Sequence, residues 1–308
     1  MLALKLRSNF GLPRSLHVRQ FSTGVYIWKP PSTLAIRGGG SNVKDKLMMP
    51  TMPQRIKEFD GLNISKLVIG NRHSAAISAD GKLYTFGSGN WGVLGHGNEN
   101  ALSFNSPKLV ETLAKADAKI VDFAAGEYHS VALGQDGSVW TWGYGGKKGF
   151  FNWMFTQEIG ALGHGDVAPH FHPKRVAFFE KQGLKAKQIA AGNYHSVALC
   201  DDGNLYAWGV GLYGVLGNGS NQQALVPKIV DEFVYLFEDA KEEDLSLSIS
   251  KVSAADDYTA VIMSDGQLLV WGKNDRGQMG IGPGVGVDLV ESETIPLAVN
   301  FQQALPES

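Results

Sequence analysis

Residues 189–217 read IAAGNYHSVALCDDGNLYAWGVGLYGVLG, and this stretch decides the fold. His195–Leu199 is expected to form a strand, and Leu205–Trp208 is expected to return beside it. Between them, Asp202-Gly203 suits a tight hairpin because glycine tolerates the positive φ that such a turn requires. Gly and Asp separate the apolar runs and no 3.6-residue period is present, so the stretch predicts β-structure.

The same pattern occurs four times along the chain. Each copy has a His-Ser pair or a drifted equivalent, then Asp-Gly, then an aromatic residue followed by Gly, then Leu-Gly or Met-Gly. The repeated positions are His73, Gly81, Gly87 and Gly95; His129, Gly137, Gly143 and Gly163; His195, Gly203, Gly209 and Gly217; and Gly266, Gly272 and Gly280. Each copy ends in Pro-x-x-Val, and the hairpin glycines are 56, 66 and 63 residues apart. Self-similarity at this spacing predicts a repeat architecture, in which neighbouring units stack to bury their faces.

These repeats resemble those of the regulator-of-chromosome-condensation family, whose mark is G-x-x-H-S, D-G, an aromatic-Gly pair and L-G in that order. The resemblance covers roughly residues 25–300 and implies an all-β, seven-bladed β-propeller with four-stranded blades. Short strands with glycine-rich turns, and no helical segment expected between the motifs, agree with a radial all-β array. A Kelch-type propeller is the rival, but the Gly-Gly doublet of that class is not repeated from copy to copy, and Gly145-Gly146 is a single instance among the four copies.

The repeat boundaries predict a half repeat at 25–56 and whole repeats at 64–110, 119–176, 187–230 and 249–299, within a propeller domain over 22–308. About four and a half repeats are fewer than seven blades, so the ring is expected to be incomplete. Three explanations compete: a truncated gene model or fragment, an open array capped by a partner, and a ring completed by a second chain. The first is favoured because no capping sequence follows the last repeat.

The first 21 residues differ in composition from the rest. Leu2, Leu6 and Phe10 would share one face of a short helix, and no acidic residue precedes Asp45. The basic residues of this segment are Lys5, Arg7, Arg14 and Arg19. This composition predicts a mitochondrial transit peptide over residues 1–21, and a disordered basic tail is the alternative.

Charge and cysteine content narrow the function classes. Without residues 1–21 the formal charge falls from −2 to −6, because 24 Lys and Arg then face 30 Asp and Glu. Such a chain has no general attraction for phosphate backbones, so nucleic acid is a disfavoured partner. The single cysteine, Cys200, fits a reducing compartment, and no apolar run is long enough to span a membrane.

The repeated histidines His73, His129 and His195 stand one per repeat, and Thr259 is taken to fill that position in the fourth copy. Ligands of one metal ion would have to converge, whereas these are spread along the chain. We therefore expect each imidazole to bond to backbone within its own blade and to hold a turn.

Two other patterns resemble functional sites, one for a nucleotide and one for a metal ion, but both are expected to be structural or surface features. Gly87–Gly92 and Gly209–Gly214 match G-x-G-x-x-G, but they lie at the same place in successive repeats and open no βαβ unit, so they are expected to be turn glycines. The loop 162–173 has the composition of a metal site, but its spacing fits no standard zinc site, and surface histidines are expected. Its candidate ligands are His164, Asp166, His170 and His172. No catalytic residue, metal or cofactor is predicted, and the chain is not expected to be an enzyme.

One copy breaks the repeat. Between the aromatic-Gly and Leu-Gly pairs, copies one, three and four have seven positions, whereas copy two has nineteen, which is a twelve-residue insertion over 144–155. Its candidate binding residues are Lys147, Lys148, Phe150, Phe151, Trp153 and Phe155. Aromatics in a protruding loop can anchor a protein partner or a membrane surface, or they can fold down and cover the propeller. A second departure, the acidic run Glu238–Asp244, is expected to be a solvated loop.

The sequence therefore predicts a non-enzymatic mitochondrial β-propeller, in the matrix or on the matrix face of the inner membrane, that acts as a scaffold for protein partners. Mitochondrial relatives in the family imply roles in respiratory-complex or mitoribosome assembly. Guanine-nucleotide exchange on a GTPase is the alternative function that the resemblance implies. An RNA-associated assembly role is a second alternative, which the net charge disfavours.

Overall fold

The computed structural model describes residues 57–97, 103–146, 160–280 and 292–299, together with four short strands in the first 55 residues. The chain divides into two compact units, Met1–Ile64 and Ser65–Ser308. All the predicted contact residues of the insertion, from Lys147 to Phe155, lie outside the described residues.

The first unit contains one antiparallel sheet. Its strands are β1 (Leu4–Lys5), β2 (His17–Phe21), β3 (Gly24–Trp28) and β4 (Gln54–Arg55), in that order. Strands β3 and β4 fall within the predicted half repeat, whereas β1 and β2 fall within residues 1–21. The short helix η1 (Lys57–Phe59) follows.

The second unit contains four antiparallel sheets of four strands each, and every sheet keeps the order of its strands in the chain. The first sheet has β5 (Ile64–Ile69), β6 (His73–Ser78), β7 (Leu83–Gly87) and β8 (Phe104–Leu109). The second has β9 (Ile120–Ala125), β10 (His129–Gly134), β11 (Val139–Gly143) and β12 (His170–Arg175). The third has β13 (Ala186–Ala191), β14 (His195–Cys200), β15 (Leu205–Gly209) and β16 (Ala224–Ile229). The fourth has β17 (Ile249–Ala255), β18 (Tyr258–Met263), β19 (Leu268–Lys273) and β20 (Ser292–Ala298).

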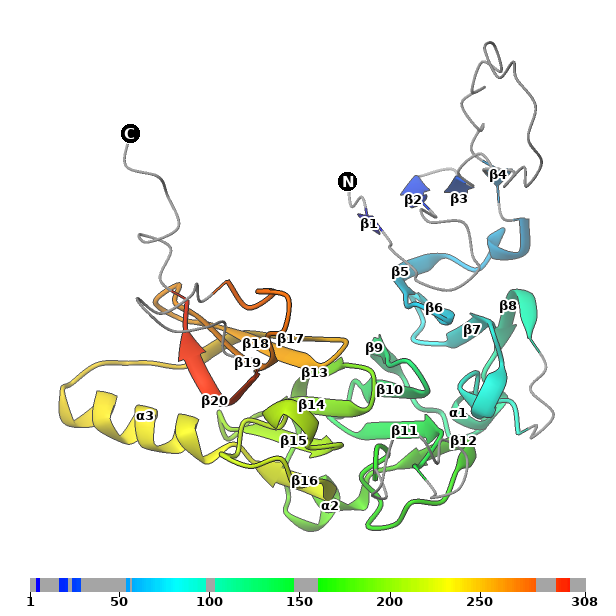
Figure 1. Ribbon diagram of the computed structural model, residues 1–308. Coiled ribbons are helices and arrows are strands. Elements are labelled where there is room, and N and C mark those ends of the chain that lie inside the picture. Colours follow the sequence, from blue (N-terminus) through cyan, green and yellow to red (C-terminus); the bar gives the residue numbers. More distant parts are fainter. Residues whose placement is uncertain are drawn as a thin grey trace, which may run out of the picture. The chain divides into compact units, whose positions relative to one another are not determined.

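This arrangement confirms the predicted fold class of four-stranded antiparallel blades (Figure 1). We call the four sheets of the second unit blades one to four. Among the described residues there are five four-stranded sheets, fewer than the seven blades that the family resemblance implies. The strands between motifs follow the expected pattern, with Gly81, Gly137, Gly203 and Gly266 at positive φ in the hairpins.

The expectation that no helix separates the motifs was wrong. Helices α1 (Glu111–Lys115), α2 (Ala177–Lys181) and α3 (Asp231–Glu242) link successive blades. The first two have five residues each, which is too short for a 3.6-residue period to be visible in the sequence. The acidic run Glu238–Asp244 is also not a loop, because its first five residues form the end of α3, although its carboxylates are exposed as expected.

The G-x-G-x-x-G segments are turns, as predicted. Each contains a single short 3-10 helix, η2 (Asn90–Gly92) or η3 (Leu212–Gly214), rather than the α-helix of a nucleotide-binding unit. Trp91 and Tyr213 at their centres adopt positive φ of 67° and 60°.

Successive blades are joined by backbone and side-chain contacts. The first strands of blades two, three and four lie side by side in chain order, β9 beside β13 and β13 beside β17. Strand β9 also lies beside β6, the second strand of blade one. The outer strand of each following blade accepts a hydrogen bond from the blade before it. These bonds run from Gly97 N to Phe171 O, from Gly165 N to Leu225 O and from Gly219 N to Thr294 O, each at 2.9 Å.

The repeated histidines connect neighbouring blades, which corrects the expectation that each bonds to backbone within its own blade. His73 Nε2 lies 2.7 Å from Ser130 Oγ, and His129 Nε2 lies 2.8 Å from Ser196 Oγ. His195 Nε2 lies 2.9 Å from Thr259 Oγ1. All six side chains are buried. The serine that follows each histidine is therefore the partner of the histidine one repeat earlier.

The register of blade four also corrects the position of Thr259. Tyr258 pairs with Gly272, just as His195 pairs with Gly209, so Tyr258 stands at the histidine position. Thr259 stands at the serine position and bonds to His195 accordingly. The fourth copy has thus lost its histidine but kept the hydroxyl that the third copy needs.

The hydrogen bonds fix the tautomer of two imidazoles. Ser130 Oγ donates to Val93 O at 2.7 Å, and Thr259 Oγ1 donates to Val215 O at 3.0 Å. Since each hydroxyl has one proton to donate, it must accept the Nε2–H of His73 or His195. Nδ1 of each imidazole is left as a buried lone pair that has no hydrogen-bond partner in the described part of the chain.

Tryptophans at the aromatic-Gly pairs fill the space between blades. Trp142, Trp208 and Trp271 are completely buried. The ring of Phe179 in α2 lies 5.8 Å from that of Trp208, and Phe233 in α3 lies 5.9 Å from Trp271. Each of these helices therefore packs a phenylalanine from the end of one blade onto the core of the next.

The glycine of G-x-x-H is required by the imidazole beside it. A Cβ on Gly192 would lie 2.2 Å from His195 Cε1 and 2.8 Å from Asp256 O. Replacing Gly192 by alanine should therefore lower the free energy of unfolding by about 1–3 kcal/mol, the usual cost of overpacking. Ala255, three residues before Tyr258, is the matched control: Ala255→Gly should cost no more than about 1 kcal/mol. Urea denaturation of both variants measures this, and equal losses would contradict the assignment.

Acid should destabilise the blades through the buried histidines. Burial lowers the pKa of His73 and His195 to about 3, helped by the charge of His129, and lowers the pKa of His129 to about 4. The unfolded chain protonates near pH 6.5, so stability is full above that pH and falls as pH drops toward the folded pKa values. Each histidine should cost about 1.4 kcal/mol per pH unit in this window.

The matched variant is His195→Gln, whose amide can still donate to Thr259 but does not titrate. Its unfolding free energy, measured from pH 7.5 to pH 5, should fall less steeply than that of the natural chain by about 1.4 kcal/mol per pH unit. Parallel profiles would show that His195 does not stay neutral in the folded protein.

Candidate functional site

The two ends of each blade carry different parts of the repeat. Because His129 pairs with Gly143, and His195 with Gly209, the turn before each second strand and the loop after each third strand lie at the same end. We call this the loop end. The Asp-Gly hairpins and helices α1–α3 lie at the other, which we call the hairpin end. The twelve-residue insertion belongs to the loop end.

Packing fixes the chain on both sides of the insertion, at Tyr144 and at Gly160. Tyr144 N donates to Tyr128 O at 2.9 Å, and the Tyr144 ring lies 5.3 Å from Trp91 and 6.5 Å from Tyr128. At the return, Gly160 packs so closely on Leu225 of β16 that a Cβ would lie 2.5 Å from a Leu225 methyl group. The insertion therefore leaves from an aromatic cluster on blades one and two, and re-enters against blade three.

A row of polar side chains crosses the loop end beside that cluster. Arg72 forms an ion pair with Glu127, and its Nη2 donates to Tyr128 Oη at 3.0 Å. The rings of Tyr128 and Tyr194 stack at 5.2 Å. Asn193 Nδ2 lies 3.5 Å from Asp257 Oδ1 on blade four. Arg72, Tyr128, Tyr194 and Asp257 occupy the same repeat position, immediately before the histidine position, so the row is a product of the repeat.

The electrostatics of this row favour structure over catalysis. Burial raises the pKa of Tyr194, as does the neighbouring Tyr128, and burial raises the pKa of Tyr144. These phenols stay protonated at neutral pH and cannot act as bases. Burial also raises the pKa of Asp257, although the charge of Lys273 opposes this. The arrangement can hold the loops in place and present an aromatic, mixed-charge surface to a partner.

The junction between blades two and three differs from the neighbouring junctions at its tryptophan. Val93 O accepts hydrogen bonds from both Ser130 and Trp142, and Val215 O accepts them from both Thr259 and Trp271. At blade two the equivalent residue is Ala161, directly before the Leu162-Gly163 pair. Trp208 Nε1, which would reach that carbonyl, is buried and has no hydrogen-bond partner among the described residues.

The histidine-rich segment 162–173 does not gather its candidate ligands. His164 donates to Thr141 Oγ1 at 3.1 Å, and its ring lies 4.8 Å from that of His170. His170 Nε2 is 4.0 Å from Asp166, whereas His172 turns to Thr112 at 3.0 Å. His170 and His172 belong to β12 rather than to a loop. Across the described ranges, no group of three or more His, Cys, Asp or Glu side chains could hold a metal ion.

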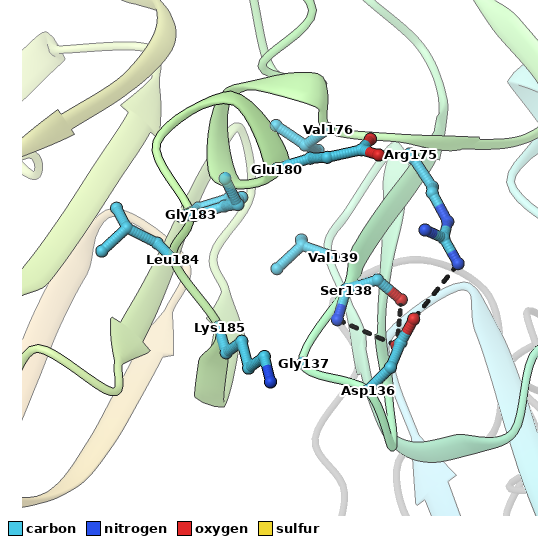
Figure 2. A pocket seen from close by; sticks show the side chains of 11 residues that line it. Asp136, Gly137, Ser138, Val139, Arg175, Val176, Glu180, Gly183, Leu184 and Lys185 are labelled. Carbon is cyan, nitrogen blue, oxygen red and sulfur yellow. Dashed lines mark hydrogen bonds and ion pairs between the residues drawn. The ribbon is translucent and has the colours of Figure 1, made fainter.

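A pocket of about 220 Å³ lies at the hairpin end between blade two and helix α2 (Figure 2). Val139, Val176 and Leu184 contribute its apolar lining. At its rim, Arg175 Nη2 pairs with Asp136 Oδ2 at 3.2 Å. Because this acid and base neutralise each other, the pocket offers no reactive group from that pair.

Cys200 is completely buried, and burial raises the pKa of its thiol to about 12. It is therefore an inert core residue. None of the helices in the described part of the chain is long and apolar enough to cross a membrane.

The structure places the predicted repeat-structural residues in the hairpins and at the contacts between blades. Gly87, Gly143, Gly209 and Gly272 all have φ near 110° opposite the histidine position. Gly95, Gly163 and Gly217 lie against Trp142, Trp208 and Trp271, and Gly280 closes the corresponding turn of blade four. Sequence reasoning missed the hydroxyl partners Ser130, Ser196 and Thr259, although the repeated serine was a visible signal.

A family model for the RCC1-like domain matches residues 33–305. The chain therefore belongs to the RCC1-like domain family, as its motifs predicted. The ultraviolet-B receptor UVR8 of Arabidopsis thaliana is 31% identical over 272 residues, covering 75% of this chain and 58% of the receptor. The E3 ubiquitin-protein ligase HERC2 of Homo sapiens is 30% identical over 234 residues, which is 75% of this chain but 4% of the ligase.

A third relative is the mitochondrial RCC1 domain-containing protein RUG3 of Arabidopsis thaliana, 31% identical over 222 residues, or 67% of this chain and 44% of the relative. The chain thus spans less than two thirds of each of these relatives. Among solved structures, human WBSCR16 has a TM-score of 0.67 at 23% identity over 93% of this chain and 65% of its own. Yeast RCC1 (Prp20), in a complex with Kap60, has a TM-score of 0.66 at 21% identity, over 94% and 60%. These two structures support the fold.

Proposed function

We propose that this chain is a non-enzymatic scaffold of mitochondria, which binds protein partners during assembly of respiratory complexes or mitoribosomes. The observation that carries the proposal is the insertion after Tyr144. It interrupts an otherwise regular array, and the residue from which it starts, Tyr144, packs on aromatic rings at the loop end. Rigid support where a binding loop joins the fold limits the entropy lost on binding.

The mitochondrial part of the proposal rests on two supports. The basic, acid-free composition of residues 1–21 is that of a transit peptide, and one relative is named as mitochondrial. The family match begins downstream of this segment, at residue 33. Cleavage after Phe21 would remove β1 and β2, so import would have to precede formation of the first sheet. Sequencing the N-terminus of the endogenous protein tests this, and an intact Met1 on organellar protein would contradict it.

The absence of enzymatic activity is also part of the proposal. The similarity to the ligase HERC2 covers 4% of that protein, so the ligase name gives no reason to assign ligase activity here. Tyr144 and Tyr194 at the loop end are protonated at neutral pH, and Arg72 is paired with Glu127, which supports a binding role.

Guanine-nucleotide exchange on a GTPase is the alternative function. It is supported by the likeness of the fold to yeast RCC1. Measuring nucleotide release from candidate organellar GTPases separates the two, because a scaffold leaves the release rate unchanged. An RNA-associated role is a second alternative, and the net charge of −6 without residues 1–21 argues against it.

Deleting residues 147–155 should abolish capture of the partner from mitochondrial matrix, because the aromatic anchors are removed together. The natural chain should capture one defined complex: respiratory-chain subunits, mitoribosomal proteins, or a GTPase. The unfolding free energy of the deletion variant should stay within about 1 kcal/mol, since surface changes away from packed features have small effects.

The matched control is the quadruple alanine variant of Phe150, Phe151, Trp153 and Phe155, which keeps the loop length and both lysines. It should lose capture as the deletion does. Capture that survives both changes would show that the insertion covers the propeller rather than binds. A large loss of stability in both would point to the same structural role.

A further inference from the structure

Helix α3 departs from the repeat as clearly as the insertion does, and at the opposite end of the blades. Helices α1 and α2 have five residues, whereas α3 has twelve. From the valine of Pro-x-x-Val to the first residue of the next blade there are ten positions after Val110 and after Val176, but nineteen after Val230. The extra turns carry α3 outward beyond β16 (Figure 1).

The inward face of α3 is fully used by the fold. Phe233 is completely buried against Trp271, and Ala240 is also buried. Phe237 packs on Phe233 at 6.2 Å. The helix is therefore held rigidly, and its other face is free to serve a different purpose.

The outward face of α3 combines one tyrosine with carboxylates. At about 100° per residue, the side chains nearest to Tyr235 around the helix are all acidic. They are Asp231, Glu232, Glu238, Asp239 and Glu242. All five are exposed, and none forms an ion pair within the described residues. Tyr235 is 62% exposed, the highest value among the large hydrophobic side chains that the structure describes.

A second exposed apolar side chain stands at the end of the helix. Asp244 has a φ of 60°, and Leu245 N donates to Ala240 O at 2.8 Å, which is the bond of a Schellman motif. In that motif the residue after the left-handed one commonly packs back on the helix. Leu245 instead is 59% exposed. It follows the last residue of the helix, Glu242, which lies about 10 Å along the axis from Tyr235.

This distribution of charge works against the stability of the helix. Glu238 and Glu242 are like charges four residues apart, as are Asp239 and Glu243, and each such pair costs about 0.2–0.5 kcal/mol. Carboxylates near the C-terminus also oppose the helix dipole. Local rules broken in this way, without compensation from an ion pair, are expected where a function needs the residues.

We propose that the outward face of α3, from Tyr235 to Leu245, is a docking surface for a basic amphipathic helix of a partner protein. The two exposed apolar side chains contact the apolar face of that helix. The carboxylates around Tyr235 pair with its flanking Lys and Arg side chains. Charge selects this occupant, because an anionic membrane surface or RNA would be repelled.

The surface is tested on the full chain with a synthetic 18-residue Lys/Leu amphipathic peptide, and with its Glu/Leu counterpart as the control probe. Fluorescence anisotropy should show binding of the Lys/Leu peptide only. The triple variant Glu238→Gln, Asp239→Asn, Glu242→Gln should weaken binding at least tenfold while raising the melting temperature, because the repulsion is removed.

Tyr235→Ala separates docking from general electrostatic attraction, since it changes no charge. It should also weaken binding at least tenfold. The matched control, Glu111→Gln with Glu180→Gln on α1 and α2, should bind as the natural chain does. Full binding by Tyr235→Ala, or equal loss in the control, would reduce the effect to net charge and overturn the proposal, as would no binding at all.

Deleting residues 147–155 should leave peptide binding unchanged, because the insertion lies at the loop end. Loss of matrix capture with intact peptide binding would therefore show that only the insertion is needed for capture. Intact capture with loss of peptide binding, in the α3 variants, would show that only α3 is needed for peptide binding.

Discussion

The structure depends on a hydrogen bond between a neutral, buried imidazole and a hydroxyl of the next blade. His73, His129 and His195 each reach a Ser or Thr one repeat further along the chain. This bond imposes two conditions on the sequence. The imidazoles of His129 and His195 lie against Gly126 and Gly192, where a Cβ would collide with the ring, which explains the glycine of G-x-x-H in these two copies. Each imidazole must also remain unprotonated, which its burial ensures. The motif of a single repeat thus encodes a contact between two neighbouring blades.

The fold class was predictable because the same strand-and-turn pattern occurs four times in the sequence. Asp-Gly hairpins, aromatic-Gly pairs and Leu-Gly turns are local signals, and each formed the element expected of it. The partners of the histidines were not deduced, since the pairing of His73 with Ser130 spans 57 residues and becomes evident only when the blades stack. The position of Thr259 was misjudged by one residue for a related reason. The pairing of Tyr258 with Gly272, rather than the residue types of the motif, shows which residue of blade four is equivalent to the histidine.

The helices show a different limit of sequence reasoning. The five-residue helices α1 and α2 have no periodicity to detect, and their existence follows from the need to pack a side chain such as Phe179 on the next blade. Helix α3 did carry a signal, with Phe233, Leu236, Phe237 and Ala240 at helical spacing. The acidic run that overlaps its end concealed it. The candidate site was predictable to the extent that the insertion breaks the repeat, whereas the aromatic cluster beneath it comes from three separate segments.

Within the described residues, the buried indole N–H of Trp208 has no hydrogen-bond partner. A buried donor without an acceptor costs about 1–3 kcal/mol, and its counterparts Trp142 and Trp271 do not bear this cost. A partner that turned the Ala161 carbonyl toward Trp208 would recover that energy at the junction between blades two and three. By reciprocity, a mutation that stabilised the same geometry at this junction would raise the affinity for the partner. Binding of a partner to the loop would then make the junction between blades two and three more rigid.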